Sequence, residues 1–180
     1  MKRIAIFASG SGSNAQNIIS FFKKDETACV PLILSNNPNA FVLERAKSLG
    51  VATFVFDKKE FLSESGVLKT LQTFKIDFIV LAGFLWKFPK ILLTHFRGSV
   101  INIHPALLPK YGGKGMYGMK IHTQVVANNE KETGITIHEV NDQYDKGAVV
   151  FQIKCRLDSM ETAESLAKKI HILEMEHFPR

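Results

Sequence analysis

The chain has 180 residues, of which 46% are hydrophobic and 22% charged, a composition that excludes an intrinsically disordered protein and predicts one globular domain over 1–180. The formal net charge of +6 favours an anionic partner. The lysines and arginines are scattered, and no basic run is interleaved with aromatic residues, which argues against nucleic acid and favours small anionic molecules.

The first part of the chain, 1–110, alternates predicted strands and helices. Each predicted strand is a short apolar run, which is typical of the buried strands of a parallel sheet. The predicted strands are Arg3–Ala8, Cys29–Leu34, Thr53–Phe56, Asp77–Ala82 and Val100–Ile103. The predicted helices are Ala15–Lys24, Ala40–Leu49, Gly66–Phe74 and Pro89–His95. This alternation predicts an α/β fold with a doubly wound, mostly parallel sheet of Rossmann-like type.

The second part of the chain, 111–180, has a different pattern. A predicted helix over Met119–Asn128 is followed by two apolar or alternating runs, Ile135–Val140 and Val149–Cys155. These two runs and the loop between them predict a C-terminal antiparallel hairpin. An amphipathic pattern over Thr162–His177 predicts a closing helix.

No apolar run is long enough to cross a bilayer, since the longest is Phe78–Trp86. The first apolar run, Ile4–Ala8, is too short for a signal peptide, so we expect a cytoplasmic protein that does not bind membranes. We expect Cys29 and Cys155 to be buried free thiols in a reducing compartment, because both lie in apolar runs. No cysteine or histidine spacing typical of zinc occurs, so we expect no metal.

A glycine-rich turn, Gly10–Ala15, joins the first predicted strand to the first predicted helix. It fits the G-x-G-x-x-A pattern, in which glycines let backbone N–H groups approach an anion at a helix start. Dinucleotide binding also needs an acidic residue after the second strand, where this chain has Ser35-Asn36-Asn37. We therefore expect a bound phosphate rather than NAD, with a plain tight turn as the alternative. Gly113–Gly118 also matches G-x-G-x-x-G, but it follows a proline loop instead of a strand and is interpreted as a chance match.

Asn102 and His104 lie two residues apart at the end of the fifth predicted strand, so both side chains point to one face. An amide beside an imidazole suits acyl transfer, since the amide can stabilise an oxyanion while the imidazole exchanges a proton. A core asparagine and a hydrogen-bonded histidine are the alternative, because Asn-x-His alone is a weak signal.

The segment Asp142–Gly147, within the predicted hairpin loop Asn141–Gly147, supplies two carboxylates. A carboxylate near His104 would raise the pKa of the imidazole. Asp and Gly are also common turn residues, so a solvated turn is the alternative. No G-x-S-x-G elbow or supported cysteine nucleophile occurs, so we expect direct transfer between two bound substrates, without a covalent enzyme intermediate.

Taken in order, these segments resemble the phosphoribosylglycinamide formyltransferases of purine biosynthesis over nearly the whole chain. The motifs that carry the resemblance are Ser9–Asn14, Ser35-Asn36, Leu81–Phe84, Asn102–Pro109, Gly134–His138 and Asp142–Gly147. The resemblance implies transfer of the formyl group of 10-formyltetrahydrofolate to the amine of glycinamide ribonucleotide. It also implies that these two small molecules are the substrates.

The resemblance further implies a role for each matching residue. The ribonucleotide would contact Gly12, Ser13, Asn14 and Glu174, and the folate would contact Leu85, Trp86, Lys87, Phe88 and Asn102. Asn102 would stabilise the formyl oxygen and His104 would take part in proton transfer. Asp145 would raise the pKa of His104 and order a water that relays the proton to the folate nitrogen. His138 would support this cluster from its strand.

The chain departs from many members of that family at Leu85-Trp86, where they have Met-Arg, and in its longer, glycine-rich Tyr111–Met119 loop. Formyltetrahydrofolate hydrolase is one alternative function. Methionyl-tRNA formyltransferase is a weaker one, because 180 residues leave no room for its extra RNA-binding domain. A non-catalytic folate- or nucleotide-binding module need not keep Asn102, His104 and Asp145 together. We expect a monomer or a homodimer.

Overall fold

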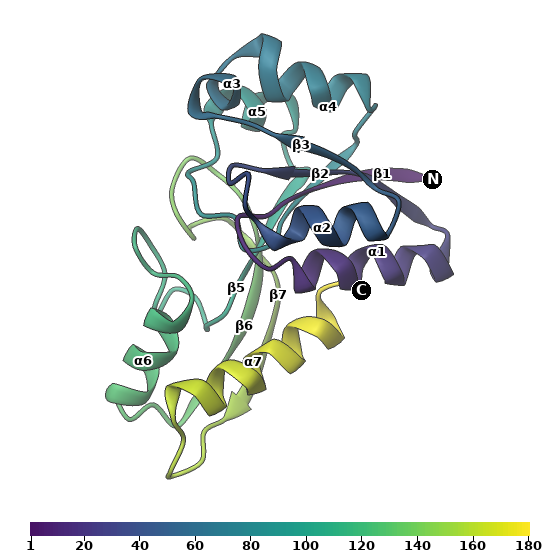
Figure 1. The fold of residues 1–180 in the computed structure, drawn as a ribbon. Helices are drawn as coiled ribbons and strands as arrows, with labels where there is room; N and C mark the ends of the chain where they lie inside the picture. The colour runs from purple at the N-terminus through teal and green to yellow at the C-terminus, as the bar shows by residue number, and fades with distance from the viewer. The chain divides into compact units, whose positions relative to one another are not determined.

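The computed structural model describes all 180 residues, which form two compact units (Figure 1). The first unit comprises Met1–Ile101 with Pro179, and the second comprises Asn102–Phe178 with Arg180. The sheet has the strand order β3-β2-β1-β4-β5-β6-β7, and the boundary between the units lies within β5. The expectation of a single domain with parts 1–110 and 111–180 stays a prediction.

The first unit is built on parallel strands. These are β1 (Lys2–Phe7), β2 (Ala28–Ser35), β3 (Ala52–Val55) and β4 (Phe78–Leu81). The first residues of β5 (Val100–His104), the next strand in the sheet, also belong to this unit. β1 pairs in parallel with both β2 and β4, and β2 pairs in parallel with β3. Residues 5–8 and 32–34 are completely buried, which explains why these strands are continuous apolar runs in the sequence.

Helices cover both faces of these parallel strands (Figure 1). On one face lie α1 (Ser13–Asp25) and α2 (Phe41–Ser48), and on the other lie α3 (Lys58–Leu62), α4 (Lys69–Thr73) and α5 (Lys90–His95). The predicted doubly wound architecture is therefore confirmed in the first unit.

The predicted helix over Gly66–Phe74 is present after Gly66, but a short helix precedes it that the sequence analysis did not predict. α3 comes first, then the π-helical turn η1 (Glu64–Leu68), then α4. Asp57 begins α3 through a capping box with Glu60, a sequence signal that the prediction missed. Gly66 breaks the helical backbone, and a Cβ there would lie 2.2 Å from the carbonyl oxygen of Glu60. This close approach bends the chain at Gly66, so the predicted helix begins at the bend and α3 lies before it.

The second unit contains the end of β5 and the antiparallel pair β6 (Glu132–Glu139) and β7 (Val149–Arg156). This pair confirms the predicted hairpin. The helices of this unit are α6 (Met119–Ala127) and α7 (Ala163–His177), and α7 packs against both α6 and β6. The predicted closing helix is thus confirmed, with Thr162 as its N-cap residue.

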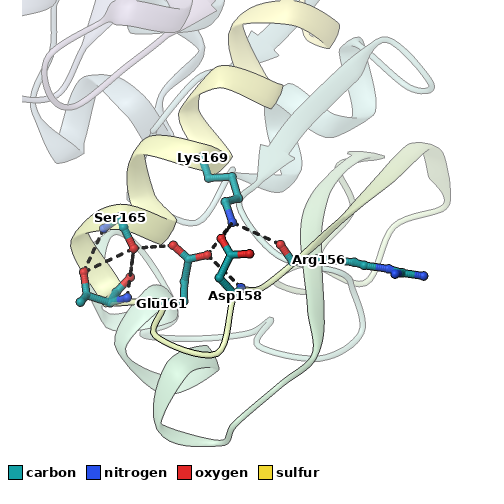
Figure 2. A network of polar contacts seen from close by, with 6 residues as sticks. Arg156, Asp158, Glu161, Ser165 and Lys169 are labelled. Carbon is teal, nitrogen blue, oxygen red and sulfur yellow. Dashed lines mark hydrogen bonds and ion pairs between the residues drawn. The ribbon is translucent and has the colours of Figure 1, made fainter.

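A polar network fixes the start of α7. Thr162 caps the helix, and Lys169, farther along it, donates to the carboxylates of Glu161 and Asp158 (Figure 2). The same ammonium donates to the main-chain carbonyl of Arg156, the last residue of β7. Lys169 therefore ties the end of β7 to α7 across the connecting loop.

Three further expectations concern the chain as a whole. None of the helices is both long enough and apolar enough to traverse a bilayer. Cys29 and Cys155 are free thiols, as predicted, but the expectation that they are buried is wrong, because both lie near strand ends and are only half-buried. No three His, Cys, Asp or Glu side chains are grouped so as to hold a metal ion, and the expected absence of a metal stays a prediction.

Candidate active site

The second unit brings together four side chains named in the sequence analysis, which we call the Asn-His cluster: Asn102, His104, His138 and Asp145. They come from the end of β5, from β6 and from the β6–β7 loop. Asp145 Oδ2 lies 3.7 Å from His104 Nδ1, and Asp145 Oδ1 lies 3.5 Å from His138 Nε2. Asn102 Nδ2 lies 3.1 Å from His138 Nε2. Segments about 40 residues apart along the chain thus meet around one carboxylate.

The loop backbone holds Asp145 toward these histidines. Asp145 adopts a left-handed conformation with φ 54°, which aspartate tolerates better than most residues. Gly147 follows closely, and a Cβ there would lie 1.7 Å from the carbonyl oxygen of Glu139, so the loop requires glycine at this point. The N–H of Gly113 donates to Asp145 Oδ2 at 2.8 Å. With its side chain only 11% exposed, Asp145 is not part of a solvated turn, whereas Asp142 is exposed.

The main chain sets the proton position on His104. Its Nε2 lies 2.8 Å from the carbonyl oxygen of Tyr111, so Nε2 carries the proton of the neutral ring. Nδ1 then faces Asp145. The Tyr111 hydroxyl donates to Glu130 at 2.9 Å and accepts from Asn128 at 2.8 Å, which anchors this loop residue. Sequence reasoning missed Tyr111, because it acts through a main-chain carbonyl that no side-chain pattern reveals.

The pKa values of the central pair follow from burial and charge. Burial lowers the pKa of His104, which is 3% exposed, and outweighs the opposing effects of Asp145 and the Tyr111 carbonyl. Asp145 raises the pKa of His104, as expected, although burial makes the net shift downward. Burial disfavours the charged form of Asp145, but its contacts with His138, the Gly113 N–H and His104 prevail and lower its carboxyl pKa. At neutral pH the pair is a neutral imidazole beside an ionised carboxylate.

His138 orients the amide of Asn102. His138 Nδ1 lies 2.7 Å from the Glu139 carbonyl oxygen, so Nδ1 carries the proton of the neutral ring and Nε2 is an acceptor. The Asn102 amide nitrogen donates to this Nε2. One amide hydrogen is thereby used within the Asn-His cluster, and the second is left for another acceptor. Of the alternative weighed for this pair, the hydrogen-bonded histidine is present, since His104 contacts the Tyr111 carbonyl, but Asn102 is only half-buried and is not a core residue.

Thr136 fixes the segment that follows His104. Its completely buried hydroxyl donates to the Ala106 carbonyl at 2.7 Å and accepts from the Leu108 N–H at 3.1 Å. The side chain of Gln152 also donates to it at 2.8 Å. One β6 hydroxyl thus holds two points of the chain just after His104.

The expected phosphate-binding turn lies in the first unit. Gly12 is the N-cap residue of α1, no side chain caps this helix, and its first turn holds no acidic residue. Such a helix start favours an anion. Gly12 has φ 74°, and a Cβ on it would lie within 2.8 Å of three Val42 atoms. Packing against α2 is therefore sufficient to explain why position 12 is glycine. The feature that suits a phosphate is the helix start at Ser13 and Asn14, which no side chain caps.

The expected folate segment, Leu85–Phe88, follows β4 in the same unit. Phe88 is 3% exposed and packs on the Phe7 ring at a centroid distance of 5.4 Å, so its side chain belongs to the core. Trp86 packs on Phe61 at 5.8 Å, with Lys58 Nζ 4.6 Å from its ring centroid. Leu85 and Lys87 are exposed. A ligand here would meet main-chain groups and the Leu85 side chain.

Glu174, the expected ribose contact, lies on α7 in the second unit. Its Oε2 is 3.3 Å from Nδ1 of His171, one turn earlier on the same helix. The Glu174 side chain is 14% exposed, whereas that of His171 is 45% exposed. His171 had no role in the sequence analysis, although the i,i+3 spacing could have indicated this pair.

Comparisons with known proteins agree with this arrangement. The sequence profile described as formyl transferase matches residues 2–180. The chain is 37% identical to "Phosphoribosylglycinamide formyltransferase, chloroplastic" of Arabidopsis thaliana, over 98% of this chain and 62% of the relative. It is 33% identical to phosphoribosylglycinamide formyltransferase of Bacillus subtilis (strain 168), over 99% of this chain and 92% of the relative. The chain therefore spans somewhat less than two thirds of the plant relative and nearly all of the bacterial one.

A solved structure shows the same likeness. The crystal structure of phosphoribosylglycinamide formyltransferase from Bacillus halodurans matches with a TM-score of 0.88 and 36% identity, over 99% of this chain and 92% of that one. These matches confirm the family resemblance that the sequence motifs indicated. The chain therefore belongs to the formyl transferase family.

Proposed function

We propose that the protein transfers the formyl group of 10-formyltetrahydrofolate to the amine of glycinamide ribonucleotide, a step of purine biosynthesis. The observation that carries this proposal is the buried Asn-His cluster, in which an oriented amide adjoins a neutral imidazole and an ionised carboxylate. Family membership and the names of the relatives support the same reaction. The proposal includes no metal and no covalent enzyme intermediate.

The proposed chemistry begins when the amine nitrogen attacks the formyl carbon. A C–N bond forms, and the carbonyl oxygen gains negative charge. The second amide hydrogen of Asn102 donates to that oxygen, and a preorganised donor of this kind stabilises the charge as it develops. The bond between the formyl carbon and the folate nitrogen then breaks, and the proton lost by the amine goes to that folate nitrogen.

His104 and Asp145 handle the proton in this scheme. Since Nε2 of His104 is committed to the Tyr111 carbonyl, Nδ1 is the ring atom that accepts a proton. The ionised Asp145 carboxylate, 3.7 Å away, stabilises the imidazolium that forms. A water ordered by Asp145 relays the proton to the folate nitrogen.

We assign the ribonucleotide phosphate to the start of α1 and the folate to the segment that follows β4. The ribonucleotide phosphate lies at the uncapped start of α1, near Gly12, Ser13 and Asn14, and Glu174 contacts the ribose. The folate lies along Leu85–Phe88, and Asn102 contacts its formyl group. Because Phe88 is buried, recognition by this segment is mainly through its backbone. A cytoplasmic location and a monomeric or homodimeric state stay predictions.

One assay separates this function from its alternatives. Formation of the folate product is followed spectroscopically, with glycinamide ribonucleotide present or omitted. Product that forms only with the ribonucleotide supports formyl transfer. Equal product without it identifies a hydrolase, which uses water in place of the amine. No product in either case leaves the non-catalytic binding module and the weaker tRNA-formyltransferase alternative.

A further inference from the structure

Ser9 is a buried polar residue with no role in the proposed chemistry. It lies just after β1 and immediately before the glycine-rich turn Gly10–Ala15, and it is 8% exposed. Since β1 pairs with β2 on one side and β4 on the other, Ser9 lies among the ends of three strands. Polar groups buried in such a position need hydrogen-bond partners.

Every hydrogen-bonding group of Ser9 is used. Its N–H donates to the Gly83 carbonyl at 3.0 Å, and its carbonyl accepts from Asn37 Nδ2 at 3.4 Å. Its hydroxyl donates to Asn36 Oδ1 at 2.6 Å and accepts from the Leu85 N–H at 3.1 Å. Ser9 thus joins the segments that follow β2 and β4 to the start of the turn.

The bond to Leu85 connects the two proposed substrate segments of the first unit. Leu85 is the first residue of the proposed folate segment, and its side chain is half exposed. Burial therefore does not hold this end of the segment, whereas Trp86 and Phe88 anchor the remainder through their ring contacts. We propose that Ser9 is a positioning residue that fixes the start of Leu85–Phe88 beside the ribonucleotide turn. This inference rests on the proposed function, because it takes these segments as the substrate sites.

The physical reason is preorganisation. A ligand that is recognised through backbone groups binds tightly when those groups are already in place, since ordering a loose segment costs conformational entropy. Without the Ser9 hydroxyl, the Leu85 N–H loses its acceptor and the left-handed turn at Gly83, with φ 73°, is less constrained. Loss of the Ser9 hydroxyl is therefore expected to weaken folate binding and to leave the chemical step unchanged, because the Asn-His cluster belongs to the second unit.

Ser35 offers a matched control. It is completely buried, and its hydroxyl also makes two hydrogen bonds, both of 3.2 Å, with the N–H and carbonyl of Asn37. It makes no bond to Leu85. Ser9→Ala and Ser35→Ala each remove one buried serine hydroxyl at the end of a strand, so a general loss of stability affects both.

The experiment measures two properties of the wild type and both variants. The first is the hydrogen-exchange rate of the Leu85 amide, read by NMR in the ligand-free protein. The second is the set of steady-state constants for 10-formyltetrahydrofolate and glycinamide ribonucleotide. Ser9→Ala is expected to raise the Leu85 exchange rate and the folate KM about tenfold, the effect of leaving one donor unpaired. Its kcat and ribonucleotide KM should stay within about twofold of wild type. Ser9→Thr keeps the hydroxyl and should restore the folate KM.

The outcomes are distinguishable. An unchanged Leu85 exchange rate in Ser9→Ala overturns the proposed bridge. Faster exchange with an unchanged folate KM, or an equal rise of that KM in Ser35→Ala, overturns its role in binding. If the wild type transfers no formyl group, the proposed function fails, while the Leu85 exchange rate still decides whether Ser9 holds the segment.

Discussion

The Nε2 nitrogen of His104 lies 2.8 Å from the main-chain carbonyl oxygen of Tyr111, and this contact decides which ring nitrogen can accept a proton. Nδ1 is left as the acceptor and faces Asp145 at 3.7 Å. Burial keeps the imidazole neutral at pH 7 by lowering its pKa. His104 is therefore suited to accept a proton near neutral pH, which makes it the first residue to test.

His104→Ala and Asp145→Ala should each retain substrate binding but lose turnover. General acid–base groups contribute about 10²–10⁴-fold, so a fall of that size in kcat is expected, with KM values close to wild type. Steady-state kinetics measures both constants. His95→Ala is the control, because His95 is an exposed residue of α5 whose ring contacts only the Ile91 carbonyl of its own helix. A near-wild-type kcat in either test variant would show that its assigned role is wrong.

The pH dependence of kcat should report the protonation of His104. A base with a lowered pKa is active above that pKa, so kcat should fall only as the pH drops below the ordinary histidine value of 6.5. Asp145 raises the pKa of His104, and Asp145→Asn removes this effect. The acidic limb of the residual activity should therefore move to lower pH. A move to higher pH contradicts the assignment.

Gly147→Ala should disturb both the fold and the reaction. The added Cβ would lie 1.7 Å from the Glu139 carbonyl oxygen, so the loop that carries Asp145 must shift. We expect a loss of more than about 2 kcal/mol in the free energy of unfolding, together with a lower kcat. Urea unfolding measures the first effect. Gly10→Ala is the stability control, because a Cβ there meets nothing within 4 Å, and an equal loss of stability in both variants would contradict the steric explanation.

Thr136→Val should destabilise the segment that follows His104. Valine has nearly the same shape but leaves the Leu108 N–H and the Ala106 carbonyl without the Thr136 hydroxyl. Unpaired buried polar groups cost about 1–3 kcal/mol each, and chemical denaturation should show a loss in that range. Thr133→Val is the control, because Thr133 lies on the same strand, is similarly buried and makes neither of these bonds. Equal stability of the two variants would exclude the proposed anchoring.

The strands and the hairpin could be predicted because buried strand residues form apolar or alternating runs in the sequence. Residues 5–8 are apolar because both faces of the sheet are covered there. A continuous apolar run of this length is typical of a buried strand in a parallel sheet. α3 was missed although Asp57 and Glu60 form a capping box, because only five residues follow the cap. The helix predicted from Gly66 begins where the nearby Glu60 carbonyl bends the chain.

The candidate site was predictable only in its side chains. Asn102, His104 and Asp145 could be named from spacing and family motifs, and the structure brings them together with His138. The effect of Asp145 on the pKa of His104 was predicted, but the larger, opposing effect of burial was not, because the depth of burial is a property of the folded chain. The roles of the Tyr111 carbonyl and the Ser9 hydroxyl could not be predicted from the sequence. Each depends on a hydrogen bond between a side chain and a main-chain group, which no residue pattern indicates.

The contact between Gly12 and Val42 has a consequence for reading related genomes. A chain that had lost its nucleotide, but kept α2 in place, would still have to retain glycine at position 12 to avoid a clash. Glycine at position 12 therefore indicates that the packing of α1 against α2 is kept, and does not by itself indicate activity. Gly10 is different, because a side chain there would meet no neighbouring atom and packing does not demand its absence. In a divergent copy of this protein, a bulky residue at position 10 would therefore be the better sign that the phosphate is no longer bound.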